Sequence, residues 1–316
     1  MKFNQRVYGI IGVASYMANW NADFTGRPKS TSSGHVFGSD KALKYAIKHY
    51  WEQNEEKVLY IKSYTIGKSS KKFIPRDLTE RYQYIFNEEV KKKDESEKVL
   101  SNLFSAIDVL NFGATFAVEG QNIGLTGIVQ IGQGINRLED SKTEIQDILS
   151  PFRNSKKETP ESSEQKDAAS IGKKVVSNEA HYFYPFSVNP NHYDQYIGLV
   201  DGFEGYTEEA YHKFKDAALV AATALNTNSK SGCSNEFSLF ITCKEGSHLY
   251  LPQLDNYIDY QKMDNKNVID LEKLDALIKP FTEQIEQVEV FYDPYHVEVV
   301  NAENFMLKNI FTKELV

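Results

Sequence analysis

Apolar and polar positions form two different patterns in the first fifty residues of this chain. Residues 7–16 read V-Y-G-I-I-G-V-A-S-Y, an almost unbroken apolar run that predicts a buried first strand. In residues 40–51 the apolar side chains instead stand three and four positions apart, at Leu43, Ala46, Ile47 and Tyr50. This period predicts an amphipathic helix, which Ser39 or Asp40 would cap. The opposite face of this helix carries a row of lysines, at Lys41, Lys44 and Lys48.

The same patterns predict alternating strands and helices along the rest of the chain. Strands are predicted at residues 58–66, 112–118, 123–131, 180–188, 237–243 and 288–292. Helices are predicted at residues 78–90, 96–107, 207–225 and 271–279. Residues 150–174 are rich in Ser, Lys, Glu and Pro without a core-forming period, and they predict a loop.

The order of these elements predicts an α+β fold. It is compatible with a ferredoxin-like or RRM-type β-α-β-β-α-β palm, built on an antiparallel sheet and carrying large insertions. A length of 316 residues suits one large domain with insertions or two domains. We expect a single domain over residues 1–316, with a mostly helical insertion at 67–107 and a flexible insertion at 150–180.

A long polar segment, residues 17–38, separates the first strand from the lysine-bearing helix. It is rich in Gly, Ser and Thr, and a segment of this length without regular structure is usually functional or mobile. It also carries Arg27 and Lys29, so the segment and the helix together could hold a phosphate backbone. The alternative is that the lysines form an ordinary solvated helix face.

The distribution of charge favours a polyanion as partner, although the net charge of the chain is −8. Residues 1–160 hold 23 Lys and Arg against 19 Asp and Glu, whereas residues 161–316 hold 13 against 25. Residues 27–76 are the most basic part, with 11 basic and four acidic side chains. Binding responds to the local potential, so a basic surface on an acidic protein can still hold RNA.

Several classes of protein find no support in the sequence. No run of 18 apolar residues occurs, so no membrane span and no membrane partner are predicted. Two cysteines, Cys233 and Cys243, cannot form a disulfide framework and do not make a CxxC pair, which favours a cytoplasmic location. The seven histidines include no HExxH motif, so neither a metal nor another cofactor is predicted.

Three weaker signals leave enzymatic alternatives open. Asp23 could serve as a general acid or a metal ligand, and His35 could take part in acid–base cleavage of RNA. The turn at residues 67–69, G-K-S, is similar to the end of a P-loop. Because Lys62 stands where that motif needs its first glycine, a lysine-rich hairpin turn explains these residues better.

Two adjoining segments resemble the N-terminal signature of a known family. They read A-N-W-N-A-D-F-T-G-R-P-K-S from residue 18 and F-G-S-D-K-A-L-K-Y-A-I-K from residue 37. The family is the CRISPR-associated Cascade backbone subunit, and the similarity is greatest to its type I-B version. Supporting segments occur at residues 108–117, 127–136, 205–211 and 231–237, together with the aromatic strand near 180–190. Trp20 and Ala22 depart from the commonest family pattern.

The resemblance implies an RRM-like palm that binds CRISPR RNA without cleaving it. Several copies would stack along one guide, together with other CRISPR-associated subunits, and present the guide for pairing with target DNA. A thumb from the insertion would kink the RNA at regular intervals. The positions that match the RNA-gripping residues of the family are Asn19, Asn21, Arg27, Lys29, Ser39, Lys44 and Lys48. The thumb would have Phe152, Arg153 and Asn154 near its base and Ile171 near its tip.

The resemblance also sharpens the enzymatic alternative. Related type III subunits cleave target RNA with an aspartate in the corresponding first loop, whereas type I subunits do not. The competing hypothesis is therefore an endoribonuclease that uses Asp23 with a metal, or His35 as an acid–base group.

Overall fold

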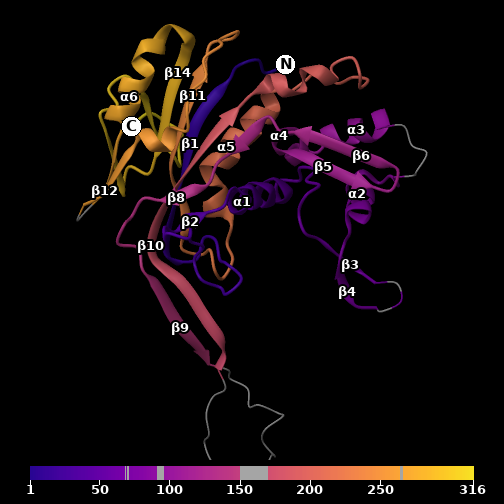
Figure 1. Ribbon diagram of the computed structural model, residues 1–316, viewed down its shortest axis with the longest axis horizontal. Coiled ribbons are helices and arrows are strands. Elements are labelled where there is room, and N and C mark those ends of the chain that lie inside the picture. The colour runs from indigo at the N-terminus through magenta and orange to yellow at the C-terminus, as the bar shows by residue number, and fades with distance from the viewer. Residues whose placement is uncertain (68, 70, 91–95, 150–169, 264–265) are drawn as a thin grey trace, which may run out of the picture.

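The computed structural model describes residues 1–67, 69, 71–90, 96–149, 170–263 and 266–316. Within these ranges nine strands form one sheet, in the order β16-β14-β11-β1-β10-β8-β2, with β7 and β9 also paired to β10 (Figure 1). The strands are β1 (Val7–Ala18), β2 (Phe37–Gly38), β7 (Val129–Ile131), β8 (Gly134–Asn136), β9 (Thr143–Leu149), β10 (Ser170–Val188), β11 (Cys233–Cys243), β14 (Ile285–Tyr292) and β16 (Met306–Asn309). All pair antiparallel except β14 with β16.

The first strand, β1, lies at the centre of this sheet, as its apolar run predicts. It pairs with β10 on one side and β11 on the other, and residues 7–15 are all buried. Gly9 is needed here, since a Cβ atom at this position would lie 2.1 Å from the carbonyl oxygen of Leu239. The glycine therefore allows the neighbouring strand to approach closely.

Two helices, α1 (Asp40–Gln53) and α5 (Glu208–Ala224), cover one face of the sheet. Both were predicted from their 3.6-residue period, and α1 buries Leu43, Ala46, Ile47 and Trp51. No helix in the described ranges is both long and apolar enough to cross a bilayer.

The C-terminal part of the chain covers the other face. There a second sheet joins β12 (Asp259–Lys262), β13 (Asn267–Asp270) and β15 (Val297–Val300). It packs with α6 (Glu272–Ile278) and the 3-10 helices η2 (Leu254–Tyr257) and η3 (Lys279–Gln284) against apolar side chains of β1 and β11. Within residues 281–316, β15 belongs to this layer, whereas β14 and β16 form one edge of the main sheet (Figure 1).

A separate lobe lies beside α1, on the right in Figure 1. It contains α2 (Leu78–Phe86), α3 (Ser96–Phe104), α4 (Ile107–Phe112) and two ribbons, one of β5 (Gly113–Val118) with β6 (Gln121–Thr126) and one of β3 (Tyr64–Ile66) with β4 (Phe73–Pro75). The 3-10 helix η1 (Pro190–Tyr196) follows β10. The helix predicted at 96–107 ends earlier, at Phe104. The chain turns at Ser105, and a second helix, α4, begins at Ile107.

The strand predicted at residues 58–66 is wrong except for its last three residues. The backbone N–H groups of Leu59 and Tyr60 donate to the two carboxylate oxygens of Asp108, at 2.8 Å each. Arg81 in turn donates to the carbonyl oxygens of Val58 and Leu59. Side chains distant in sequence satisfy this backbone, so the segment needs no strand partner.

The loop predicted at residues 150–174 is also partly wrong. Residues 170–174 belong to β10 and pair with β9, and together these strands form a two-stranded stalk that extends beyond the sheet (Figure 1). All seven residues of β9 are exposed, so this strand has no buried face and is held by backbone hydrogen bonds to β10. Hydrophobic periodicity indicates a strand only where one face of it is buried, and β9 has no buried face.

Candidate nucleic-acid interface

The segment predicted to hold RNA, residues 19–38, leaves the end of β1 and returns to the sheet as β2. We call it the first loop. Bridges between Ala22 and Pro28 and between Ser30 and Val36 fold it into two successive turns. Trp20 anchors it, since its indole N–H donates to the hydroxyl of Tyr184 at 2.5 Å and the ring is buried. The first loop therefore has a defined shape on the surface of the sheet.

Asn19 ties the first loop to the stalk. Its side chain is only 3% exposed, and its amide donates to the carbonyl oxygens of Gly26 and Val175, at 2.9 and 3.1 Å. Lys230 donates to the carbonyl oxygens of Asn19 and Trp20, both at 2.6 Å, and burial lowers the pKa of this lysine. Asn19 thus positions the loop, and its contact with RNA stays a prediction.

Asn21 and Ser39 connect the first loop to the start of α1. The side-chain oxygen of Asn21 accepts the backbone N–H of Ser39 at 2.8 Å, and its carbonyl oxygen accepts the N–H of Lys29 at 2.8 Å. Ser39 caps α1 through the N–H of Ala42, as predicted. Both side chains are half-buried, so they fix the loop relative to the helix.

The two cations of the first loop face solvent to different degrees. Arg27 is exposed at the tip, next to Phe24, whose ring is also fully exposed. Lys29 is half-buried, with its ammonium 5.8 Å from the centre of the Phe37 ring. None of the ion pairs between described residues involves either side chain. Both cations are therefore available to an anionic ligand.

The lysine row on α1 is less accessible than its spacing predicts. Lys41 is exposed, whereas Lys44 pairs with Asp40 at 3.3 Å and lies 5.4 Å from the ring centre of Phe112. Lys48 donates to the carbonyl oxygen of Tyr60 at 2.8 Å. Burial lowers the pKa of Lys48, and the charge of Asp108 partly opposes that effect. The expected solvated row is thus partly covered, because residues 57–60 pass beside the helix.

Asp23, the candidate catalytic aspartate, shapes the tip of the first loop. One carboxylate oxygen accepts the N–H and hydroxyl of Thr25, at 2.7 and 2.8 Å, and the N–H of Arg27 at 3.0 Å. The hydrogen bonds from Thr25 and Arg27 lower the pKa of this exposed carboxyl group. This arrangement is a side-chain-capped turn, a frequent structural use of aspartate in loops.

His35 lies in the second turn of the same loop and is exposed. Its backbone N–H donates to the hydroxyl of Thr31 at 3.1 Å, and its carbonyl oxygen accepts the N–H of Thr31 at 2.9 Å. Within the described ranges, no group of three His, Cys, Asp or Glu side chains is placed to hold a metal ion.

The four residues assigned to the thumb can be located only in part. Phe152, Arg153 and Asn154 lie outside the described residues. The backbone of Ile171 belongs to β10, near the far end of the stalk (Figure 1).

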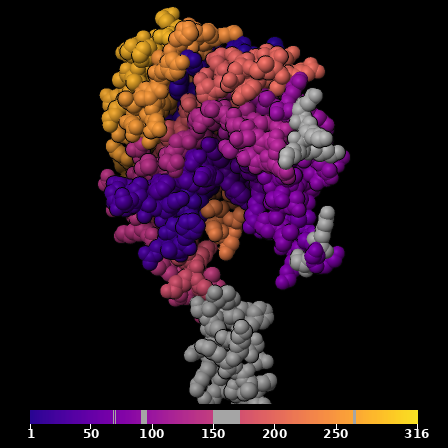
Figure 2. Space-filling model, turned by 45° about the vertical axis from the view of Figure 1, so that its right-hand side comes forward, coloured from indigo at the N-terminus to yellow at the C-terminus, as the bar shows by residue number. Residues whose placement is uncertain are grey.

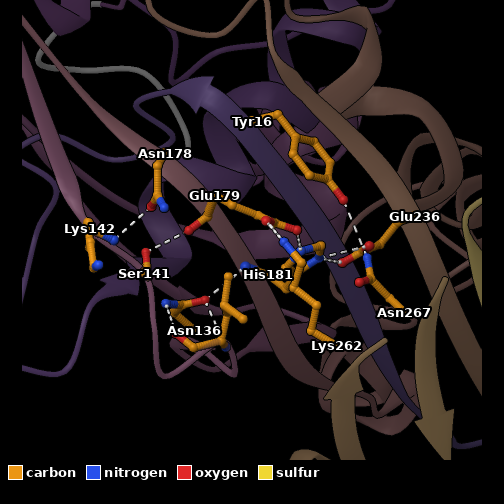
Figure 3. A network of polar contacts seen from close by, with 11 residues as sticks. Tyr16, Asn136, Ser141, Lys142, Asn178, Glu179, His181, Glu236, Lys262 and Asn267 are labelled. Carbon is orange, nitrogen blue, oxygen red and sulfur yellow. Dashed lines mark hydrogen bonds and ion pairs between the residues drawn. The ribbon is translucent and has the colours of Figure 1, made fainter. Parts of the chain in front are cut away.

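A buried polar network at the base of the stalk was not predicted from the sequence. His181 on β10 is fully buried, with Nδ1 at 2.8 Å from Glu236 and Nε2 at 3.1 Å from Glu179 (Figure 3). Glu179 also pairs with Lys262 of β12. Burial by itself would lower the pKa of His181, but the charges and hydrogen bonds of Glu236 and Glu179 outweigh it and raise the pKa.

This network joins the stalk to both layers of the molecule. Tyr16 of β1 lies edge-on to the His181 ring, with centroids 5.6 Å apart, and receives a hydrogen bond from Asn267 of β13. Tyr260 stacks on the other side of the imidazole at 4.8 Å. An imidazolium held between two carboxylates and two rings serves as a fixed anchor, because both of its N–H groups are already used. The clue in the sequence was two polar residues, Glu179 and His181, on one face of a strand that is otherwise aromatic.

Figure 2 shows how these parts surround a hollow on the molecular surface. The first loop, in indigo, and the stalk, in pink, border one side, and the lobe that carries β3 and β4, in purple, borders the other. Arg27 and Lys29 lie on the first loop, which Asn19 joins to Val175 of the stalk, and Lys41 lies on α1. The geometry provides a basic surface beside a projecting hairpin, which suits an extended anionic strand.

Comparison with known proteins identifies a family and similar solved structures. A family model described as CRISPR-associated protein Cas7 matches residues 5–278. A solved structure described as a CRISPR RNA-guided surveillance complex, pre-nicking, is similar with a TM-score of 0.51 at 12% sequence identity. The similarity covers 96% of both chains and shows a shared fold. A search of curated proteins finds no match.

Proposed function

Because this chain belongs to the Cas7 family of CRISPR-associated proteins, we propose that it binds CRISPR RNA as a non-catalytic backbone subunit of an interference complex. The observation that carries this proposal is the first loop. It carries Arg27 and Lys29, neither of which is in an ion pair with a described residue, and Asn19 joins the loop to Val175 of the stalk. Such a loop holds phosphates without reading bases, which a protein needs when its guide sequences vary.

The residues divide into those that contact RNA and those that position them. Arg27, Lys29 and Lys41 contact phosphates, with Lys44 exchanging its pairing to Asp40 for RNA. Asn19, Asn21, Ser39 and Lys48 hold the loop and helix in place. Phe152, Arg153, Asn154 and Ile171 remain the proposed thumb contacts to RNA.

The finer assignment is a type I-B backbone subunit with a ferredoxin-like palm. The antiparallel order β11-β1-β10-β8, with α1 after β1 and α5 after β10, supports this palm, because it is the strand order of a split β-α-β-β-α-β unit. Several copies then stack along one guide in the cytoplasm, together with other CRISPR-associated subunits. Target DNA is recognised by pairing with the guide.

RNA binding tests the proposal through a double charge reversal. R27E/K29E is expected to weaken the binding of a labelled ~30-nucleotide guide at least tenfold for every sequence, because phosphate contacts are independent of sequence. Fluorescence anisotropy measures this. The matched control is K244E/K279E, which changes the same charge on exposed residues of the C-terminal side. Equal affinities in the two double variants would remove the first loop as the site.

The endoribonuclease alternative has its own test. Purified protein is incubated with labelled pre-crRNA or target RNA and Mg²⁺, and products are separated by gel electrophoresis. We expect no site-specific cleavage. Cleavage that disappears in Asp23→Ala or His35→Ala would establish the enzyme instead.

A further inference from the structure

The ribbon of β3 and β4 has an apolar face that nothing in the described chain covers. Tyr64 pairs with Pro75 and Ile66 pairs with Phe73, so these four side chains lie on the same face. Tyr64, Ile66 and Phe73 are 51%, 59% and 79% exposed, and Pro75 is exposed as well. A two-stranded ribbon is only marginally stable by itself, and an exposed apolar face of this kind marks an interaction site.

The rim of this face is cationic. Residues 57–76 contain six Lys and Arg and no Asp or Glu. Lys62 lies 4.9 Å from the ring centre of Tyr64, and Arg76 donates to the carbonyl oxygen of Tyr64 at 2.6 Å. None of the ion pairs between described residues involves Lys62, Lys71 or Arg76. The partner therefore combines an apolar or aromatic surface with anionic groups.

The chain itself carries such a surface beside α3. Residues 189–212 contain five Asp and Glu and no Lys or Arg, and Leu199 is 66% exposed among them. Two of the carboxylates, Asp194 and Glu209, pair with Lys2 and Lys213, which leaves Asp201, Glu204 and Glu208 for a cationic partner. A cavity of about 190 Å³ opens here, between α3 and residues 200–203. The stacked rings of Phe104 and Phe203, 4.0 Å apart, form part of its wall, and Asp201 lies at its edge. This cavity suits a single aromatic side chain with a cation beside it.

The two surfaces lie at opposite ends of one lobe. In Figure 1 the ribbon of β3 and β4 is at the lower end of the lobe and α3 is at its upper end, and Figure 2 keeps the same separation. A ribbon cannot reach the cavity of its own chain, but a second copy displaced along this direction brings the two together. Because the surfaces differ, the contact is head-to-tail and continues from copy to copy.

We propose that the β3–β4 ribbon of one copy docks on the acidic surface beside α3 of the next, with Phe73 in the cavity and Lys71 next to Asp201. The inference rests on the proposed function, for which it supplies the contact between copies. RNA is the competing partner, because Tyr64 and Phe73 present exposed rings on which bases can stack. The cavity beside α3, which suits one aromatic side chain, favours the second copy.

Cross-linking tests the contact directly. Both native cysteines are buried, so engineered surface cysteines react selectively. Lys71→Cys and Ser105→Cys proteins both keep Phe73, and both positions are exposed. Mixed with a short bis-maleimide, they are expected to give a dimer that neither protein forms alone. The double variant K71C/S105C is expected to give a ladder of trimers and longer species. A mixture of Lys279→Cys with Ser105→Cys is the matched control and is expected to stay monomeric. Dimers of K71C alone, or no product in the mixture, would overturn the head-to-tail contact.

Short RNA separates this inference from the proposed function. F73D is expected to weaken self-association on the order of 30-fold, as loss of a buried anchor does. It is expected to leave the binding of an RNA of about eight nucleotides, long enough for one copy, unchanged. If F73D instead weakens binding of this short RNA, the ribbon is an RNA arm and the docking surface is wrong. Failure of the unmodified protein to bind any guide would contradict the proposed function. The cross-links report on the contact between copies alone.

Discussion

Asp108 is a buried carboxylate that organises the backbone of a distant segment. It is 2% exposed, burial raises its pKa, and each of its oxygens accepts one backbone N–H, from Leu59 and from Tyr60. Asp108→Asn keeps only one acceptor oxygen, so one N–H loses its partner. We expect a loss of about 1–3 kcal/mol in the free energy of unfolding. Urea denaturation measures it, with exposed Asp140→Asn as the control. Equal midpoints for the two variants would contradict this role.

His181 makes the stability of the molecule depend on pH. Its pKa is raised in the folded state, so its stabilising contribution is complete below the unfolded value of about 6.5. The contribution is then lost as the pH rises through the folded value. The charged and titratable groups around it are Glu179, Glu236, Lys262, Tyr16 and Tyr260.

His181→Gln removes the imidazolium and leaves two buried carboxylates without their partner. We expect it to cost about 3 kcal/mol near pH 6, because breaking a buried pair exposes the full penalty of the remaining charge. The difference from the unmodified protein is expected to shrink as the pH rises through the raised pKa of His181. Urea unfolding at several pH values measures this, and exposed His212→Gln is the control. A difference that stays constant with pH would show that His181 is neutral in the folded protein.

At the level of elements, β2 depends on a close contact that only glycine allows. A Cβ atom at Gly38 would lie 1.8 Å from the hydroxyl oxygen of Tyr184 and 2.8 Å from the Trp20 ring. Gly38→Ala is therefore expected to cost about 1–3 kcal/mol and to loosen the first loop, since Trp20 must shift. Thermal unfolding and hydrogen exchange of residues 19–38 measure both effects. Gly124→Ala is the matched control, because nothing lies within 4 Å of its added Cβ. Similar exchange in both variants would argue against this anchor.

The elements that sequence patterns predict are those with a buried face. β1, α1 and α5 each bury a continuous or periodic apolar set, so their positions follow from the sequence. β9 has no buried face, and the path of residues 58–63 depends on Asp108, which lies about fifty residues away in the chain. Neither feature leaves a local pattern, and both were missed for that reason.

In the candidate site, too, some features follow from the local sequence and others arise only from the fold. The positions of Arg27 and Lys29 follow from a basic polar segment, and their binding of RNA stays a prediction. The link between Asn19 and Val175 spans 156 residues of sequence, and the network around His181 joins β1, β10, β11, β12 and β13. Contacts of this kind arise only from the fold, since no short motif contains both partners.

At the scale of the whole molecule, charge is separated between two parts of the chain. Residues 27–76 carry a net charge of +7, and residues 161–316 carry −12. The basic part contains the first loop, α1 and the β3–β4 ribbon, whereas the acidic part includes the layer on the opposite face of the sheet. An anionic strand is therefore attracted to one side and repelled from the other, which orients each copy on the guide.

This separation predicts how RNA binding by a single copy responds to salt. Each phosphate contact on single-stranded RNA contributes about 0.7 to the slope of the logarithm of the binding constant against that of the salt concentration. If Arg27 and Lys29 each hold one phosphate, R27A/K29A lowers the slope by about 1.4. Anisotropy titrations of a short RNA at several salt concentrations measure it, with K244A/K279A as the control. The same loss is expected for guides of unrelated sequence, because phosphates carry no sequence information. A loss that differed between guides would mean that the first loop reads bases, and a backbone subunit serving variable guides could not be built on it.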